Sequence, residues 1–145
     1  MSLAKNIIQP CFIDTNIWLY AFVDSPNNPK HALARQIIRQ NEAIISPQVI
    51  NEVCVNLLKK TDFSEPDIRA LVASFYGNYT VIEANQEILV SASALRERYS
   101  LSYWDSLIVA TALFADCKLL YSEDMRDGLQ VDNKLTIQNP LKSET

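Results

Sequence analysis

Short apolar runs alternate along this chain with longer segments in which apolar residues recur at helical spacing. The runs predict buried strands, and the segments between them predict helices. This alternation favours an α/β fold in which a mainly parallel sheet of four to five strands lies between layers of helices. Strands are expected at residues 7–14, 43–45, 79–82 and 118–121, with an edge strand at 134–137.

Turn and capping residues mark where the helices begin. Ser46-Pro47 predicts a helix start with Ser46 as the N-cap and Pro47 at the first helical position, and Ser64-Glu65-Pro66-Asp67 predicts another. The expected helices span residues 15–23, 30–41, 46–60, 64–77, 85–99 and 102–116, with a loop at 24–29. The residues of helix 30–41 that should face the core are Ala32, Leu33, Ile37 and Ile38.

The length and composition fit one ordinary globular domain. We expect the 145 residues to form a single domain, 1–145, with a flexible tail from about residue 139. Apolar residues make up 48% and charged residues 21%, and no apolar run is long enough to span a membrane. The first residues lack the apolar core of a secretion signal. We therefore expect a cytoplasmic protein with no membrane partner.

Cysteine and histidine are too scarce for several kinds of site. The three cysteines, Cys11, Cys54 and Cys117, show no C-x-x-C spacing, so neither a zinc site nor a disulfide framework is indicated. They fit buried thiols in a reducing compartment. The one histidine, His31, excludes paired-histidine nuclease mechanisms, disfavours a Ser-His-Asp triad and is expected on a helix surface.

Four acidic residues lie where a carboxylate is locally unfavourable. Asp14 ends one apolar run, and Asp124 follows another. Glu52 lies inside an apolar helical pattern, and Asp105 opens a further one. A carboxylate at the edge of a core is destabilising unless another group offsets its charge. Four such acids at four element edges predict one shared partner, a divalent metal.

The expected fold brings these acids to one edge of the sheet. Asp14 and Asp124 would lie at the carboxyl ends of strands, where open α/β sheets bind ligands. Asp105 would lie in the first turn of its helix, with Glu52 about a turn and a half into its own. Carboxylates suit Mg²⁺ or Mn²⁺, and one or two such ions can activate water and stabilise the leaving oxygen of a phosphodiester. The set therefore predicts a metal-dependent phosphodiesterase.

Each acid also has a purely structural interpretation. Asp14 could cap the helix that follows it. Asp105 could be the acid of a capping box that begins at Ser102. Glu52 could extend from its helix edge to solvent. Asp124 is the weakest of the four, because acidic turns are common and other acids lie beside it. The joint pattern, more than any one position, supports a metal site.

The net charge of −4 disfavours a broad nucleic-acid-binding surface, which normally needs a basic excess. Without the four acids, acidic and basic residues balance at 13 each. A nucleic acid would therefore be recruited by the metal and a few local cations, for which the candidates are Arg96, Arg98 and Arg126. Trp104 is expected to be a core or rim aromatic, with base stacking as the less favoured interpretation.

At four segments the chain resembles the PIN-domain family, and within it the VapC-like toxin ribonucleases. The individual segments are degenerate, but their order and spacing over roughly residues 8–140 are specific. They are Phe12-Ile13-Asp14-Thr15-Asn16, Ile50-Asn51-Glu52-Val53, Tyr103-Trp104-Asp105-Ser106-Leu107-Ile108 and Tyr121-Ser122-Glu123-Asp124-Met125.

The resemblance implies a PIN-like three-layer fold and an endoribonuclease, the toxin of a toxin–antitoxin pair, that hydrolyses RNA with Mg²⁺ or Mn²⁺ and leaves a 5′-phosphate. The catalytic metal ligands that it implies are Asp14, Glu52, Asp105 and Asp124. Asn16 and Ser122 would support them by hydrogen-bonding the acids or a water on the metal. The fourth acidic position varies in this family, so Asp127 is a candidate substitute or addition. The implied partners are RNA, a cognate antitoxin that plugs the active site, and a second copy in a homodimer.

Two other functions remain open. A phosphohydrolase with an aspartyl nucleophile is suggested by Asp14 at a strand end, although that chemistry commonly needs a second acid two residues on, where this chain has Asn16. A non-catalytic binding module with the same fold would act through a protein partner. The presence of all four acids argues against it.

Overall fold

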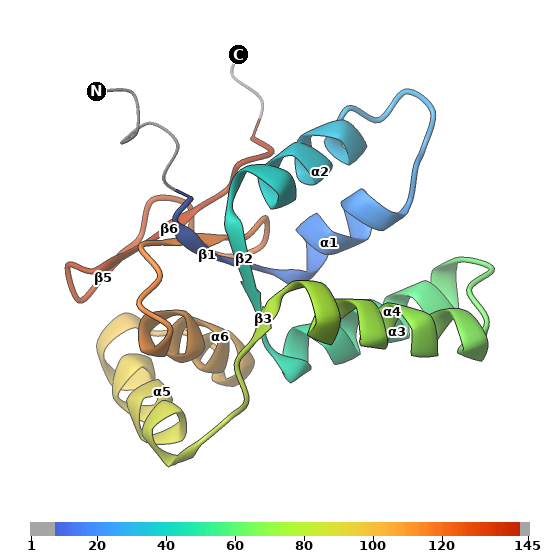
Figure 1. Ribbon diagram of the computed structural model, residues 1–145. Helices are drawn as coiled ribbons and strands as arrows, with labels where there is room; N and C mark the ends of the chain where they lie inside the picture. Colours follow the sequence, from blue (N-terminus) through green and yellow to red (C-terminus); the bar gives the residue numbers. More distant parts are fainter. Residues whose placement is uncertain (1–7, 143–145) are drawn as a thin grey trace.

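The sheet at the centre of the molecule contains six strands. A computed structural model describes residues 8–142 of the chain (Figure 1). The strands lie in the order β3-β2-β1-β4-β6-β5, and every neighbouring pair is parallel except β5 and β6. Their bounds are β1 Pro10–Ile13, β2 Glu42–Ile45, β3 Thr80–Val81, β4 Leu119–Tyr121, β5 Gln130–Val131 and β6 Leu135–Gln138.

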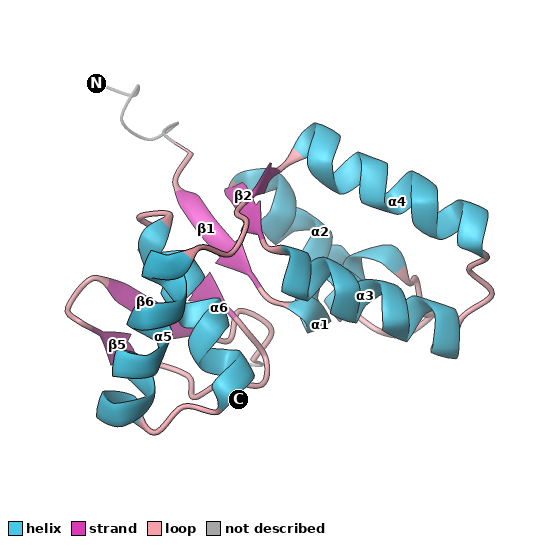
Figure 2. Cartoon of the chain, turned by 90° about the horizontal axis from the view of Figure 1, so that it is seen from below, coloured by secondary structure: helices cyan, strands magenta, loops and turns pink. Residues whose placement is uncertain are grey.

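Helices cover both faces of this sheet. They are α1 Thr15–Phe22, α2 Lys30–Gln40, α3 Pro47–Lys60, α4 Glu65–Asn78, α5 Gln86–Tyr99 and α6 Tyr103–Phe114. Figure 2 shows α5 and α6 together on one side of the strands and α1 to α4 on the other. The expected α/β fold, a mainly parallel sheet between helical layers, is confirmed.

Strand β1 is central because it is fully apolar beyond its first residue. Cys11, Phe12 and Ile13 are completely buried. Phe12 lies opposite Ile44 of β2 on one side and Leu120 of β4 on the other, both in parallel register. This register brings the carboxyl ends of β1 and β4 to the same edge of the sheet.

Aromatic packing fixes how the chain leaves β1 and enters α1. The fully buried Trp18 lies edge-on to Phe75 of α4, with ring centroids 5.1 Å apart. Its indole Nε1 donates a hydrogen bond of 2.9 Å to the carbonyl oxygen of Ile13, the last residue of β1. The turn between β1 and α1 is therefore held by both apolar contact and a buried hydrogen bond.

Several expectations about the strands were wrong. The sheet has six strands, not four to five, because the two-residue β5 was not anticipated. Residues 134–137 were expected at the edge, but β6 lies between β4 and β5, and β5 is the antiparallel edge strand. Residues 8 and 9 are not part of a strand, so β1 begins at Pro10, and residue 7 of the expected span lies outside the described residues.

The helices also differ from expectation in detail. In α2 the buried residues are Ala34 and Ile38, whereas Ala32 and Leu33 are exposed. Ser46 occupies the N-cap position of α3, yet its side chain makes no capping hydrogen bond.

The segment after β6 is packed as far as it is described. The backbone N–H of Asn139 donates to Asp127, and Leu141 is buried, while the expected flexibility of the tail from about residue 139 stays a prediction. Residues 143–145 lie outside the described part of the chain. Within residues 8–142, no helix is both long and apolar enough to cross a membrane.

Candidate active site

Asp14 is the buried carboxylate at the end of β1. It is 8% exposed, and its backbone N–H donates to the carbonyl oxygen of Tyr121 at 3.0 Å, so the ends of β1 and β4 lie side by side. Its Oδ1 accepts the N–H of Thr15 and its Oδ2 accepts the hydroxyl of Ser122, both at 2.8 Å. The bond to Thr15 makes Asp14 the N-cap of α1, as its structural interpretation proposed.

Burial is the main reason that the pKa of Asp14 is raised to about 6. The hydrogen bonds from Thr15 and Ser122 stabilise the charged form and oppose the shift. The negative charges of Glu52 and Asp105 raise the pKa further. Asp14 therefore lies close enough to both acids for their charges to affect its ionisation.

Ser122 connects the end of β4 to Asp14 and to the turn that follows. Its hydroxyl donates to Asp14 and accepts the backbone N–H groups of Asp124 at 3.3 Å and Met125 at 3.2 Å. In the same turn, the Oδ2 of Asp124 accepts the side-chain amide of Asn16 at 2.8 Å. Asn16 and Ser122 thus each donate a hydrogen bond to the carboxylate of one of the four acids.

Glu52 is the half-buried acid that α3 contributes. Its Oε2 accepts the hydroxyl of Thr15 at 2.7 Å, and its Oε1 accepts the side-chain amide of Gln48 at 3.3 Å. The same amide of Gln48 donates to the carbonyl oxygen of Trp104 at 3.2 Å. Gln48 therefore links Glu52 on α3 to the first turn of α6.

Asp105 lies in that first turn of α6 and is half-buried. Its backbone N–H donates to the Ser102 hydroxyl at 3.1 Å, which caps the helix. Burial is the largest cause of its raised pKa, the Ser102 side chain opposes the rise, and the charges of Asp124 and Glu52 add to it. Asp105 is thus electrostatically coupled to two of the other acids as well as to Asp14.

The four carboxylates gather at one rim but are not arranged as ligands of one ion. Within residues 8–142, no three histidine, cysteine or acidic side chains are grouped closely enough to hold a metal. Glu52 accepts hydrogen bonds from Thr15 and Gln48, and Asp124 accepts one from Asn16. The donor chemistry nevertheless fits a hard cation, because the set offers only carboxylate oxygens whose charges repel one another.

The other two acids near Asp124 are engaged elsewhere. Glu123 forms an ion pair of 2.7 Å with Lys30 and accepts the Tyr20 hydroxyl at 2.8 Å. Asp127 accepts the backbone N–H of Asn139 at 2.9 Å, which lowers its pKa, and lies 3.5 Å from the Lys142 ammonium. Among the acids of this turn, Asp124 is therefore the one that contacts Asn16, which lies two residues after Asp14.

The candidate cations differ in their availability. Arg98 pairs with Asp132 at 2.7 Å. Arg96 donates to the Ser106 hydroxyl at 2.8 Å, and its guanidinium lies 4.3 Å from the centre of the Tyr103 ring. Arg126 is exposed. Arg96 is thus the candidate that is held against the start of α6.

Sequence reasoning missed Thr15 and Gln48 as site residues. Both hydrogen-bond Glu52, and the Thr15 contact joins residues 37 apart in the chain. Gln48 lies one helical turn before Glu52, a spacing that places polar partners on one face of a helix and could have indicated the pair. Trp104, expected at the core or rim, is 62% exposed.

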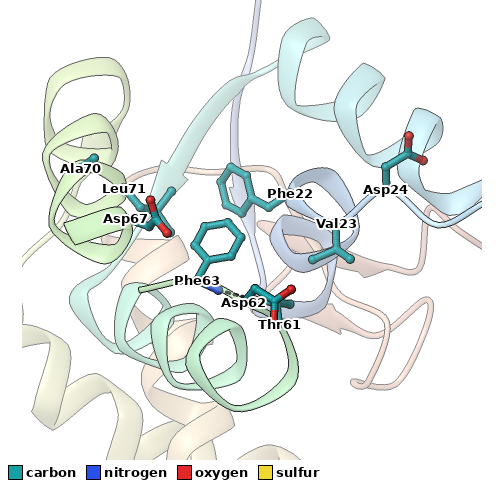
Figure 3. A pocket seen from close by; sticks show the side chains of 9 residues that line it. All are labelled: Phe22, Val23, Asp24, Thr61, Asp62, Phe63, Asp67, Ala70 and Leu71. Carbon is teal, nitrogen blue, oxygen red and sulfur yellow. Dashed lines mark hydrogen bonds between the residues drawn. The ribbon is translucent and has the colours of Figure 1, made fainter. Parts of the chain in front are cut away.

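One cavity lies away from the four acids, and another adjoins them. One of about 680 Å³ lies between the end of α1 and the turn from α3 to α4, and none of the four acids lines it. Figure 3 shows Phe22 and Phe63 at its centre, with Asp62 and Asp67 near them. A second cavity, of about 320 Å³, includes Gln48 and Trp104 and therefore adjoins the acids.

Comparisons with known proteins support the same fold. The family described as PIN domain matches residues 11–130 of the chain. No curated protein matches its sequence. Among solved structures, a toxin–antitoxin complex from Klebsiella pneumoniae is 23% identical, with a TM-score of 0.68, over 90% of this chain and 97% of that one.

Two further solved structures are similar. The VapC20 toxin of Mycobacterium tuberculosis, described as cleaving the sarcin–ricin loop, is 16% identical with a TM-score of 0.62, over 79% of this chain and 89% of its own. FitAcB from Neisseria gonorrhoeae is 13% identical with a TM-score of 0.62, over 90% of this chain and 97% of its own.

Proposed function

The chain belongs to the PIN-domain family, and we propose that it is a metal-dependent endoribonuclease and the toxin of a toxin–antitoxin pair. The observation that carries this proposal is the buried Asp14, whose charge is opposed by Glu52 and Asp105 at the carboxyl edge of the sheet. Similar folds described as toxins, one of them cleaving RNA, support the same assignment.

The acids are the proposed catalytic groups. Asp14, Glu52, Asp105 and Asp124 would hold one or two Mg²⁺ or Mn²⁺ ions. When bound, such ions neutralise the phosphate charge and favour the formation of a hydroxide nucleophile from water. Asp127 is not included, because its carboxylate is engaged with Asn139 and Lys142.

The supporting residues position the acids. Thr15 N–H and Ser122 fix both oxygens of Asp14. Asn16 holds Asp124. The Thr15 hydroxyl holds Glu52. Donors of this kind orient ligands before a cation binds, so that less reorganisation is needed on binding.

The proposed partners are RNA, a cognate antitoxin that covers the acid rim, and a second copy in a homodimer in the cytoplasm. The comparison with a toxin–antitoxin complex supports the antitoxin. A rim that gathers four negative charges would favour a basic segment of that partner.

The two alternative functions receive less support. An aspartyl phosphohydrolase would need a proton donor near Asp14, but Asn16 occupies the position two residues on and its amide is bonded to Asp124. No observation specifically favours a non-catalytic binding module. The hydrogen bonds that hold both carboxylate oxygens of Asp14 favour a catalytic site.

The test is cleavage of single-stranded RNA by purified protein. We expect internal cleavage with Mg²⁺ or Mn²⁺, no cleavage with chelator, and products that a 5′-phosphate-dependent exonuclease degrades. Asp14→Asn and Asp105→Asn should abolish cleavage and retain the circular dichroism of the wild type. Asp116→Asn is the matched control, because Asp116 is exposed and its φ of 58° suits asparagine equally well. Full activity in both site variants would refute the proposal.

A further inference from the structure

The cavity of about 320 Å³ lies directly beside the acid rim. The start of α3, the segment before α5, and helices α5 and α6 line it, with apolar side chains such as Ile82, Leu89 and Leu107. Gln48 lines it too and donates to both Glu52 and the carbonyl oxygen of Trp104. The residue that follows Trp104 is Asp105. A group bound in this cavity would therefore lie next to the proposed reaction centre.

Two exposed aromatic side chains line this cavity. Trp104 is 62% exposed and Tyr103 is 53% exposed. Their ring centroids lie 5.2 Å apart with an angle of 75° between the planes. The Arg96 guanidinium lies 4.3 Å from the centre of the Tyr103 ring. Aromatic faces beside a cation are the combination that binds single-stranded nucleic acid, because bases stack on the rings and the cation attracts the phosphates.

A buried hydroxyl in the same cavity has no partner among residues 8–142. Ser46 lines the cavity and is 6% exposed, and its Oγ accepts or donates no hydrogen bond. Although it stands at the N-cap of α3, it makes no capping bond. A buried hydroxyl without a partner is unfavourable. A ligand with a polar edge would satisfy it.

We propose that this cavity binds an unpaired RNA base next to the phosphodiester bond at the acid rim. The base stacks on Trp104, its polar edge pairs with the Ser46 hydroxyl, and Arg96 attracts the backbone. The inference rests on the proposed function, for which it supplies a specificity site. It goes beyond that function because a stacked, hydrogen-bonded base gives the enzyme a preference among RNA sequences.

A base fits these observations better than a second protein copy does. The cavity offers the exposed Trp104 ring and one unpaired hydroxyl, which suit the face and the edge of a base. A volume of about 320 Å³ is also in the range of small-ligand sites.

The experiment measures RNA binding under conditions in which no cleavage occurs. The chain contains two tryptophans, and Trp18 is fully buried, so a change in emission on adding RNA reports Trp104. Hexauridylate and hexaadenylate are titrated into the full-length protein in the presence of chelator, and binding is followed in parallel by the anisotropy of labelled oligonucleotide. We expect quenching of Trp104, with a stronger response to one of the two oligonucleotides.

Variants separate a binding role from a structural one. Trp104→Ala should weaken binding about 5- to 150-fold, the range expected for loss of one stacked base. Ser46→Ala should also weaken binding while leaving the melting temperature unchanged or raised, because the hydroxyl makes no bond in the free protein. Tyr76→Ala is the matched control, since Tyr76 is a half-exposed aromatic on α4, which lies apart from α6 (Figure 2).

Two results would overturn the proposal. One is anisotropy that reports binding while Trp104 emission does not change and Trp104→Ala binds as tightly as the wild type. The other is a Trp104→Ala protein that loses self-association but not RNA affinity, which would assign the cavity to a second copy. Chelator prevents cleavage in every titration, so the binding results do not depend on activity. An enzyme that cleaves no RNA but still shows quenching of Trp104 contradicts the proposed function alone, and an active enzyme without that quenching contradicts the base site alone.

Discussion

Replacing Asp14 with asparagine should stabilise the metal-free protein at pH 8. The wild-type carboxylate is 8% exposed, and burial is the main reason that its pKa rises from 3.8 to about 6. A raised carboxyl pKa favours the folded state only while the group is protonated. That stability is complete below about pH 4 and is lost as the pH rises through 6. A shift of about two units corresponds to about 3 kcal/mol.

Asparagine removes the buried charge but also weakens one hydrogen bond. Its NH₂ group replaces one of the two oxygens that now accept the Thr15 N–H and the Ser122 hydroxyl, so one of these donors faces another donor. Such a loss costs about 1–2 kcal/mol. The net gain at pH 8 should be about 1–2 kcal/mol, or roughly 3–8 °C in melting temperature for a chain of this size. At pH 4 the variant should be less stable than the wild type.

Thermal unfolding of both proteins in chelator, at pH 4 and pH 8, measures this effect. Asp116→Asn serves as control and should show the pH dependence of the wild type. Adding Mn²⁺ at pH 8 should reverse the order, because only the wild type gains stability, by about 2.7 kcal/mol when the ion is at one hundred times its dissociation constant. A variant that is less stable than the wild type at pH 8 in chelator would refute the reasoning.

Four further variants test the supporting residues and the choice between Asp124 and Asp127. Ser122→Ala should lower the free energy of unfolding, measured by urea titration, by about 1–3 kcal/mol, because a fully buried hydroxyl that makes three hydrogen bonds is removed. An unchanged free energy of unfolding would show that these three hydrogen bonds contribute nothing to stability. Thr15→Val should weaken Mn²⁺ binding about 10- to 100-fold in calorimetry by releasing Glu52, and unchanged affinity would exclude that positioning role. Asp124→Asn should abolish RNA cleavage while Asp127→Asn should not, and the opposite outcome would exchange the two residues in the site.

The parts of the fold that sequence predicted are those set by local chemistry. The apolar runs around Phe12, Ile44 and Leu120 became buried parallel strands. Helix α4 begins at Ser64-Glu65-Pro66-Asp67 as expected, and in the structure Ser64 and Asp67 form a capping box there. Such signals lie within a few residues of the structure that they determine, and they place the strand ends at which the acids gather.

The parts that sequence missed depend on contacts between distant segments. The edge strand β5 is two residues long and is defined by its pairing with β6. The bond from Thr15 to Glu52 joins α1 to α3, and the engagement of Asp127 depends on Asn139 after β6. No local pattern distinguishes Asp124 from Asp127, because only the folded chain shows which of them contacts Asn16.

The central claim is that Asp14, Glu52, Asp105 and Asp124 share a divalent metal. Anomalous diffraction from crystals soaked in Mn²⁺ tests it most directly. The account predicts a manganese peak about 2.0–2.3 Å from an oxygen of Asp14 and from oxygens of at least two of the other three acids. Manganese bound elsewhere, with the four carboxylates unchanged, would contradict it.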